Sequence, residues 1–177
     1  MNTPNKLTIA RMIIVPFLVI FLLTGWGGEA NRYISLTLFV VASVTDWFDG
    51  YLARKNNLVT NFGKFADPLA DKMLVMTAFI MLVELGMVPA WIAAIIICRE
   101  LAVTGLRLLL VENGGTVLAA AMPGKIKTFT QMFSIIFLLL HFSMIGTLLL
   151  YVALIFTIYS GYDYFKGARF LFKDTFK

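Results

Sequence analysis

Apolar residues form six long runs along the chain, and short segments rich in polar residues, glycine or proline separate them. The first run, 7–26, holds about 20 residues, and a helix of that length at about 1.5 Å per residue matches a hydrocarbon core of about 30 Å. Runs of similar length predict further helices at about 32–55, 64–86, 89–111, 125–142 and 146–165. The pattern therefore predicts an all-α integral membrane protein with six transmembrane helices, organised as a single membrane domain over 1–177.

The composition excludes a water-soluble domain. Of the 177 residues, 60% are hydrophobic and 14% are charged, and the mean hydropathy is +0.86. Too little polar surface exists to cover a globular protein in water. The one cysteine, Cys98, lies in an apolar run and has no second thiol with which to form an internal disulfide.

The basic residues indicate how the helices are oriented. Six spans place both termini on one side of the membrane, and fourteen of the fifteen Lys and Arg residues then lie in or near the half on that side, with Arg32 on the other. The positive-inside rule identifies this side as the cytosol. We expect a multi-pass protein of the cytoplasmic membrane, with a cytosol-facing polar cavity. Its net charge of +5 suits anionic membrane lipids, and no nucleic-acid site is evident.

Four aspartates lie within the stretch 46–71, between long apolar segments, and they are four of the ten acidic residues in the chain. An unpaired aspartate at the centre of a membrane helix costs roughly 2.5–3.5 kcal/mol, so four cost on the order of 10 kcal/mol. A cationic partner is therefore expected beside them.

The spacing of Asp46 and Asp49 predicts one shared helix face. The two residues fall at i and i+3, and Gly50 and Ala53 continue that face at i+4 and i+7. Small residues at these positions let a flat or phosphorylated ligand approach the helix backbone. Arg54 provides a cation that can pair with a phosphate.

A second face follows in the next helix, where Gly63, Asp67 and Asp71 fall at i, i+4 and i+8. A hairpin through the polar loop 55–62 makes the carboxylates of both faces converge. Such oxygen ligands suit Mg²⁺ or Mn²⁺, and four carboxylates are more than one octahedral ion usually takes from protein. We expect two divalent metal ions about 3.5–4 Å apart that clamp a phosphoryl group. One such aspartate alone is equally typical of a helix end at the membrane interface, whereas four in phase with Gly and Ala favour the metal site.

The stretch 46–71 also resembles a family signature. It reads D-x-x-D-G-x-x-A-R, then eight residues, then G-x-x-x-D-x-x-x-D, and every fixed position is similar to the signature of the CDP-alcohol phosphatidyltransferases. That family consists of integral membrane enzymes that transfer a phosphatidyl or similar group from a CDP-activated donor to an alcohol and release CMP. The resemblance implies the same chemistry here.

The resemblance also implies a role for each residue of the signature. The expected metal ligands are Asp46, Asp49, Asp67 and Asp71, and Asp71 is the expected base that takes the proton of the acceptor hydroxyl. The implied donor is CDP-diacylglycerol. The residues expected to bind it are Gly50, Ala53, Arg54, Gly63, Thr60 in the variable linker, and Thr8 in the first helix. The family further suggests a homodimer.

The fourth apolar run contains Arg99, Glu100 and Arg107. Glu100, Thr104 and Arg107 share one helix face at i, i+4 and i+7. Ionisable residues inside a membrane helix usually serve function. We expect either that Glu100 pairs with Arg107 or that Arg99 binds a ligand phosphate. A purely structural Arg–Glu pair is the alternative.

The fifth run begins with Lys125 and Lys127, followed by Thr128 and Gln131. A helix N-terminus with two lysines suits a phosphate. Topology alone also places lysines at the cytosolic end of a helix, so this pattern has two explanations.

Three short patterns resemble the members of the family that use glycerol 3-phosphate. They are Pro4-Asn5 with Leu7-Thr8 and Arg11, then Arg99-Glu100-Leu101 with Gly105-Leu106-Arg107, and Gly-Lys-x-Lys-Thr-x-x-Gln from Gly124. The resemblance implies sn-glycerol 3-phosphate as acceptor, with phosphatidylglycerophosphate and CMP as products. The residues expected to bind the acceptor phosphate are Arg99, Arg107, Lys125 and Lys127.

Two other functions stay open from the sequence. A sibling enzyme that uses serine, inositol phosphate or another alcohol has the same machinery, although a neutral acceptor gives the cations no counter-charge. The aspartates also suit a divalent-cation transport path, but a path needs polar residues along the whole membrane depth, and the far halves of the helices are almost wholly apolar. The one histidine, His141, is expected to pack at the interface, remote from the aspartates.

Overall fold

The computed structural model describes residues 3–24, 28–55, 61–112 and 122–169, and within these the side chains at 3–6, 29, 46–55, 61–68 and 111–112 are not described. The described residues form helices and no strand. The helices are α1 (Thr3–Leu23), α2 (Glu29–Lys55), α3 (Asn61–Glu84), α4 (Ala90–Glu112), α5 (Met122–Leu139) and α6 (Ser143–Gly167). The predicted all-helical architecture with six helices is confirmed, and each predicted helix overlaps one of these.

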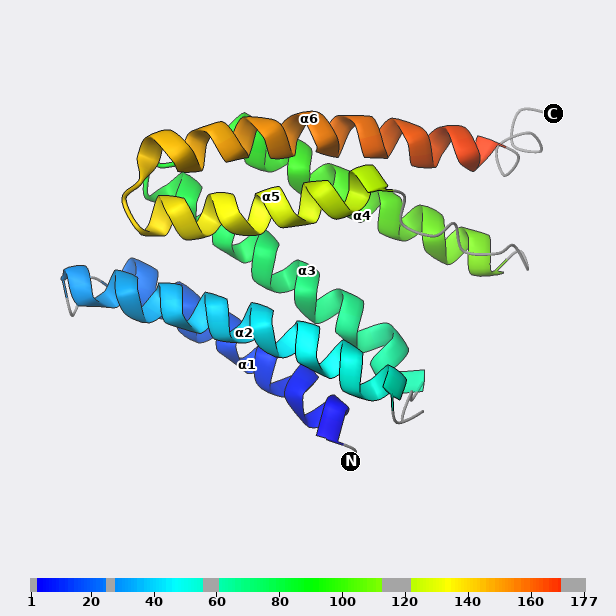
Figure 1. Ribbon diagram of the computed structural model, residues 1–177, viewed down its shortest axis with the longest axis horizontal. Coiled ribbons are helices and arrows are strands. Elements are labelled where there is room, and N and C mark those ends of the chain that lie inside the picture. Colours follow the sequence, from blue (N-terminus) through cyan, green and yellow to red (C-terminus); the bar gives the residue numbers. More distant parts are fainter. Residues whose placement is uncertain (1–2, 25–27, 56–60, 113–121, 170–177) are drawn as a thin grey trace.

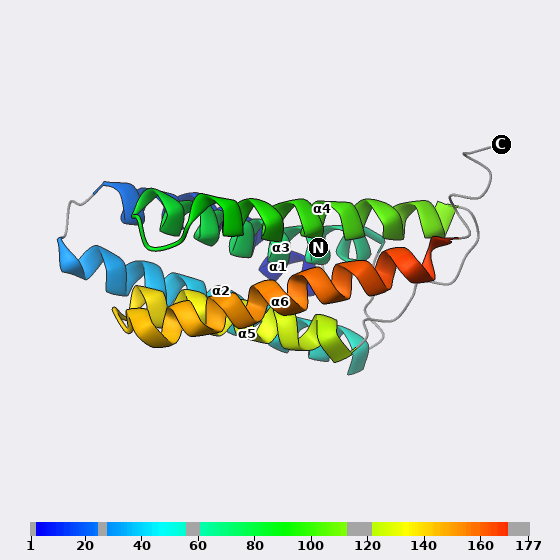
Figure 2. The same cartoon turned by 90° about the horizontal axis from the view of Figure 1, so that it is seen from above.

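The helices run back and forth along the long axis of the molecule (Figures 1 and 2). In Figure 1, α1 begins and α6 ends towards the right, whereas α5 and α6 are joined at the left. The packed pairs include α5 with α6, α1 with both α2 and α3, and α4 with both α3 and α6. The end of α4, the start of α5 and the end of α6 therefore lie at the same end of the molecule.

By length and composition, α6 is the one helix in the described part of the chain that is both long and apolar enough to cross a membrane. Its mean hydropathy is 1.9 over the most apolar window, and a shorter apolar stretch occupies Leu7–Leu23 of α1. Membrane crossing by all six helices stays a prediction.

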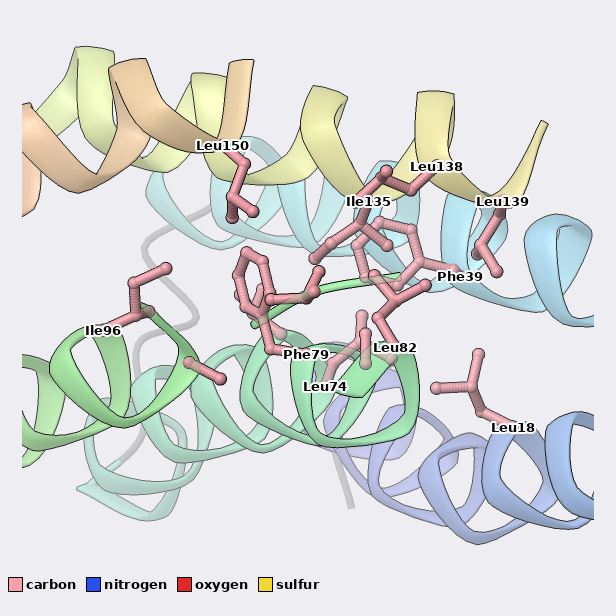
Figure 3. Close-up of a cluster of buried hydrophobic side chains, with 14 of the residues drawn as sticks. Leu18, Phe39, Leu74, Phe79, Leu82, Ile96, Ile135, Leu138, Leu139 and Leu150 are labelled. Carbon is pink, nitrogen blue, oxygen red and sulfur yellow. The ribbon is translucent and has the colours of Figure 1, made fainter. Parts of the chain in front are cut away.

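One hydrophobic core connects the helices. It lies where α3 passes between the α1–α2 pair and the α5–α6 pair (Figures 1 and 3). Every helix contributes at least one buried side chain, and the labelled members in Figure 3 are Leu18, Phe39, Leu74, Phe79, Leu82, Ile96, Ile135, Leu138, Leu139 and Leu150. The core members on α3 lie in its C-terminal half, from Leu74 to Leu82, and they hold the helix turn that precedes them, which carries Asp71.

Two helices end in the same hydrogen-bonded turn. After α3, Gly86 has a φ of 69°, and Met87 N–H donates to Leu82 O at 2.9 Å. After α5, His141 has a φ of 63°, and Phe142 N–H donates to Phe137 O at 3.0 Å. Both are αL caps of the Schellman type, which usually place glycine at the left-handed residue. His141 therefore lies in the exposed turn between α5 and α6. The lysines of α5 are at the opposite end of that helix.

Small and polar residues hold α5 against α6. A side chain built at Gly146 would meet Leu138 Cγ at 2.7 Å, so glycine is required for this approach. Ser134 Oγ donates to Gly146 O at 2.8 Å, and Gln131 Nε2 donates to Thr157 Oγ1 at 3.2 Å. These contacts hold the N-terminal part of α5 and the C-terminal part of α6 together as one packed pair.

Candidate active site

A cavity of about 230 Å³ opens between four helices at the end of the molecule where α4 ends and α5 begins. Its lining combines charged residues with a few apolar ones. The lining residues are Asp71, Lys72, Val75 and Met76 of α3; Ile96, Arg99, Glu100, Val103 and Arg107 of α4; Gly124, Lys127, Thr128 and Gln131 of α5; and Tyr164 of α6. Four cations and two carboxylates among them leave a formal charge of +2.

Glu100 pairs with two of these cations. Its Oε1 accepts a hydrogen bond from Arg99 Nη1 at 3.0 Å and another from Lys127 Nζ. Glu100 is 8% exposed and Lys127 is 5% exposed. A buried charge needs such pairing, because its removal from water is otherwise costly.

The expected pair of Glu100 with Arg107 is not the one that forms. Positions i and i+7 lie about 10 Å apart along a helix, so the two side chains have to lean towards each other to meet. Lys127 approaches Glu100 from α5 instead, and Arg107 donates from Nη2 to Tyr164 Oη of α6 at 2.5 Å. The Arg107 guanidinium carbon also lies 5.1 Å from the centre of the Tyr164 ring, a cation–π contact.

Arg99 and Arg107 each keep a buried donor without a partner. Within the part of the chain that the structure describes, neither Arg99 Nε nor Arg107 Nε makes a hydrogen bond. Both residues line the cavity. Arg11 Nε and Arg32 Nε are also buried and make no hydrogen bond among the described residues, and they do not line the cavity, so this feature does not by itself mark a ligand.

Lys72 is a cavity cation that the sequence reasoning missed. It follows Asp71 directly and donates from Nζ to Thr104 Oγ1, which in turn donates to Glu100 O at 2.6 Å. A lysine inside an apolar run, next to the last aspartate of the signature, was the available signal. Thr104 thus links α3 to the charged part of α4.

Ser160 and Tyr164 of α6 were missed as well. Ser160 Oγ accepts from Arg99 Nη2 at 2.8 Å, and Tyr164 accepts from Arg107. The available signal was a run of polar or small residues at i, i+3, i+4 and i+7 of an otherwise apolar helix, namely Thr157, Ser160, Gly161 and Tyr164, all of them buried.

Of the residues predicted to bind the acceptor phosphate, Arg99, Arg107 and Lys127 lie together on the cavity with Asp71. Lys125 does not belong with them, since its side chain is exposed and is not part of the lining. Positions i and i+2 point about 200° apart around a helix, so Lys127 facing inwards turns Lys125 outwards. Binding of the acceptor phosphate by Lys125 stays a prediction.

The residues predicted to bind the donor and the metals lie mostly outside the described side chains. Helix α2 ends at Lys55 and α3 begins at Asn61, and the two helices are in contact, so the predicted hairpin is confirmed. Asp46, Asp49, Gly50, Ala53, Arg54, Gly63 and Asp67 belong to these helices, but their side chains are outside the described set, and Thr60 is outside the described residues. Convergence of the four carboxylates stays a prediction.

Thr8 and Arg11 of α1 are buried rather than exposed to solvent. Thr8 is 1% exposed and Arg11 is 2% exposed, and neither lines the cavity described above. A buried arginine on α1, which packs against α2 and α3, lies on the side of the molecule that carries the signature hairpin. Binding of CDP-diacylglycerol by Thr8 stays a prediction.

The arrangement suits an anion held beside a carboxylate. Two guanidinium groups and two ammonium groups offer charge-assisted hydrogen bonds to phosphate oxygens. Asp71 lies on the same cavity.

Comparisons with known proteins agree with this site. A sequence model of the CDP-alcohol phosphatidyltransferase family matches residues 1–159. The chain is 49% identical to the CDP-diacylglycerol–glycerol-3-phosphate 3-phosphatidyltransferase of Bacillus subtilis (strain 168), over 93% of this chain and 94% of the relative. Proteins with the same name from Rickettsia typhi and Shigella flexneri are 43% and 39% identical, over 97% and 95% of this chain and 99% and 95% of theirs.

The match to the family covers both helices of the signature hairpin and most of the cavity, and the relatives are similar over nearly their whole length. Both findings agree with the residue pattern of the stretch 46–71 and with a charged cavity beside Asp71. This chain is a member of the CDP-alcohol phosphatidyltransferase family.

Proposed function

We propose that this protein transfers the phosphatidyl group of CDP-diacylglycerol to sn-glycerol 3-phosphate, giving phosphatidylglycerophosphate and CMP. Membership of the family supports phosphatidyl transfer from a CDP-linked donor. The names of the relatives support glycerol 3-phosphate as acceptor. The other acceptors considered from the sequence are serine and inositol phosphate.

The charge of the cavity is the observation that favours a phosphorylated acceptor, and the names of the relatives favour glycerol 3-phosphate over inositol phosphate. Among the described lining residues, Lys72, Arg99, Arg107 and Lys127 outnumber Asp71 and Glu100, which leaves a formal charge of +2. A phosphomonoester dianion neutralises this charge, and its oxygens can accept charge-assisted hydrogen bonds from the cations that line the cavity. A neutral alcohol does neither.

The donor set of the hairpin fits Mg²⁺ or Mn²⁺. Asp46 and Asp49 lie near the end of α2, Asp67 and Asp71 lie near the start of α3, and the two helices are in contact. Carboxylate oxygens are the ligands that these hard cations prefer. Two bound ions supply charge neutralisation for the diphosphate of the donor. Gly50, Ala53, Arg54 and Gly63 are the residues assigned to CDP-diacylglycerol, with Thr8 and Thr60 as further candidates.

Asp71 is assigned the role of general base. Its side chain lines the cavity where the acceptor is placed, so it can take the proton of an acceptor hydroxyl. The hydroxyl oxygen then attacks the phosphorus that bears the diacylglycerol, and the bond from that phosphorus to CMP breaks. Arg99, Arg107 and Lys127 hold the phosphate of the acceptor and orient its hydroxyl towards Asp71.

The proposed setting is the cytoplasmic membrane, with all six helices crossing it as one domain. Both termini and the cavity then face the cytosol, where CDP-linked and phosphorylated substrates occur. In support, α1 and α6 run in opposite directions along the long axis, as six consecutive spans require, and α6 ends at the end of the molecule where α4 also ends (Figure 1). Exposed apolar side chains such as Leu148, Ile155 and Phe165 suit contact with lipid. A homodimer is part of the proposal on family grounds alone.

CMP release tests the proposal. Purified protein in detergent micelles is given CDP-diacylglycerol, with and without glycerol 3-phosphate, and CMP is measured over time. CMP is expected to appear when glycerol 3-phosphate is present and to stay near background with glycerol in its place. Equal release with glycerol rejects the assigned acceptor.

A further inference from the structure

One face of α6 contacts the two arginines of the cavity. Ser160 Oγ accepts a hydrogen bond from Arg99 Nη2 at 2.8 Å, and Tyr164 Oη accepts one from Arg107 Nη2 at 2.5 Å. The two α6 residues are four positions apart and so lie one above the other. The family match ends at residue 159, before either of them.

Gly161 shapes the same face around Arg99. A side chain at Gly161 would come within 3.3 Å of Arg99 Cγ and 3.8 Å of Arg99 Nε. The stem of Arg99 therefore lies against bare helix backbone. Any larger residue at this position has to move the arginine or the helix.

The hydroxyl of Ser160 is held in place by its own helix. Its Oγ donates to Phe156 O at 2.6 Å, with a second, longer approach to Thr157 O at 3.3 Å. Because its proton is directed at these carbonyls, its lone pairs face outwards and accept from Arg99. Ser160 thus acts as a fixed acceptor and not as a freely rotating hydroxyl.

Tyr164 fixes Arg107 in two ways. Its hydroxyl accepts from Nη2, and its ring lies 5.1 Å from the guanidinium carbon. Both contacts leave Arg107 Nε unpaired and buried, and the same holds for Arg99 Nε beside Ser160. The contacts with α6 thus engage one nitrogen of each guanidinium, and both arginines line the cavity in which the acceptor is placed.

We propose that Ser160 and Tyr164 are positioning residues that hold Arg99 and Arg107 ready to bind the phosphate of the acceptor. This inference rests on the proposed function, and it adds the last helix to the acceptor site. Binding a phosphate then requires no reorganisation of two long, flexible side chains, which lowers the entropic cost of binding. The effect falls on the acceptor and not on CDP-diacylglycerol.

Steady-state kinetics of Tyr164→Phe and Ser160→Ala test the inference. Tyr164→Phe keeps the ring over Arg107 and removes the acceptor oxygen. Each variant is expected to raise the KM for glycerol 3-phosphate on the order of fivefold to tenfold, the size of the net contribution of one ordinary hydrogen bond. The KM for CDP-diacylglycerol is expected to stay within about twofold, because the contacts that α6 makes with the arginines serve the acceptor phosphate. Tyr162→Phe is the matched control, since Tyr162 is on the same helix and 60% exposed.

A double-mutant cycle shows whether Tyr164 acts through Arg107. In an Arg107→Ala background, Tyr164→Phe is expected to raise the acceptor KM no further, because its partner is already gone. Gly161→Ala provides a second route, since it displaces Arg99 without removing a polar group, and it is expected to raise the acceptor KM as well. The melting temperature of each variant is measured as well. It distinguishes loss of folded protein from loss of affinity, since unfolded protein lowers the apparent kcat and leaves the KM unchanged.

The outcomes separate this inference from the proposed function. Wild-type protein that releases no CMP with glycerol 3-phosphate contradicts the proposed function. Wild-type turnover with unchanged acceptor KM in both Tyr164→Phe and Ser160→Ala contradicts the positioning role alone. The same contradiction follows if the KM values of both substrates rise equally, or if Tyr164→Phe has its full effect in the Arg107→Ala background.

Discussion

Lys127 of α5 donates a hydrogen bond to Glu100 of α4 inside the cavity, although the two residues are 27 positions apart in the sequence. The same Glu100 oxygen accepts from Arg99 at 3.0 Å. One carboxylate therefore holds two cations of the proposed acceptor site and joins two helices. The contact matters for both stability and substrate binding.

Replacement of Glu100 by Gln is expected to destabilise the protein by about 3–5 kcal/mol, because it leaves buried cations without their counter-charge. Unfolding in detergent, followed by circular dichroism, measures the loss. The double variant Glu100→Gln with Lys127→Met is expected to recover part of it, since one buried charge is then absent. Glu84→Gln, at an exposed glutamate of α3, is the matched control. If Glu100→Gln unfolds like Glu84→Gln, the pair does not support the fold.

Arg107→Ala is expected to raise the KM for glycerol 3-phosphate at least about tenfold, which corresponds to about 1.4 kcal/mol. Arg107 lines the cavity and supplies a cation for the acceptor phosphate. Lys125→Ala is the informative comparison. The sequence pattern predicts an equal increase, whereas its exposed position predicts a much smaller one. Equal increases in the two variants would show that Lys125 reaches the acceptor after all.

Asp71→Asn is expected to lower kcat by several orders of magnitude, since it removes the proposed base together with a proposed metal ligand. Donor binding is expected to survive better than turnover if the base function dominates. Turnover and CDP-diacylglycerol affinity are measured on the same preparation. Asp163→Asn, at an exposed aspartate of α6, is the control. Wild-type turnover in Asp71→Asn removes Asp71 from the mechanism.

Turnover is expected to require Mg²⁺ or Mn²⁺, because converging carboxylates and a diphosphate donor both need a cationic partner. Activity is measured after treatment with excess chelator and again after each ion is restored. Mg²⁺ and Mn²⁺ are expected to restore it, and Ca²⁺ is expected to do so poorly. Full turnover in the presence of excess chelator would be incompatible with a metal-dependent site.

The helices and the α2–α3 hairpin could be predicted from the sequence because they depend on local patterns. These are the lengths of the apolar runs and the spacing of aspartates on one helix face. The run 89–111, for example, lies within one residue of α4. Arg99, Arg107 and Lys127 were accessible for a related reason, since charges in or at the end of an apolar run require a partner. The partners themselves were not accessible, because they come from other helices.

Lys127 and Tyr164 illustrate this limit. The sequence pattern favoured Arg107 as the partner of Glu100 because both lie on one face of α4, but packing brings Lys127 of α5 closer. Tyr164 is an ordinary residue for an apolar helix, and its contact with Arg107 joins positions 57 residues apart. The sequence pattern does not distinguish Lys125 from Lys127, since both lie at the start of one helix. In the structure, the orientation of α5 turns Lys127 towards the cavity and Lys125 towards the surface.

Competition between acceptors tests the central claim most directly. Purified protein receives CDP-diacylglycerol with equal concentrations of glycerol 3-phosphate, inositol phosphate, serine, inositol and glycerol, and the lipid products are identified by mass spectrometry. We predict that phosphatidylglycerophosphate is the dominant product and forms together with an equal amount of CMP. A dominant product carrying serine, inositol or inositol phosphate, or no lipid product at all, would contradict the account.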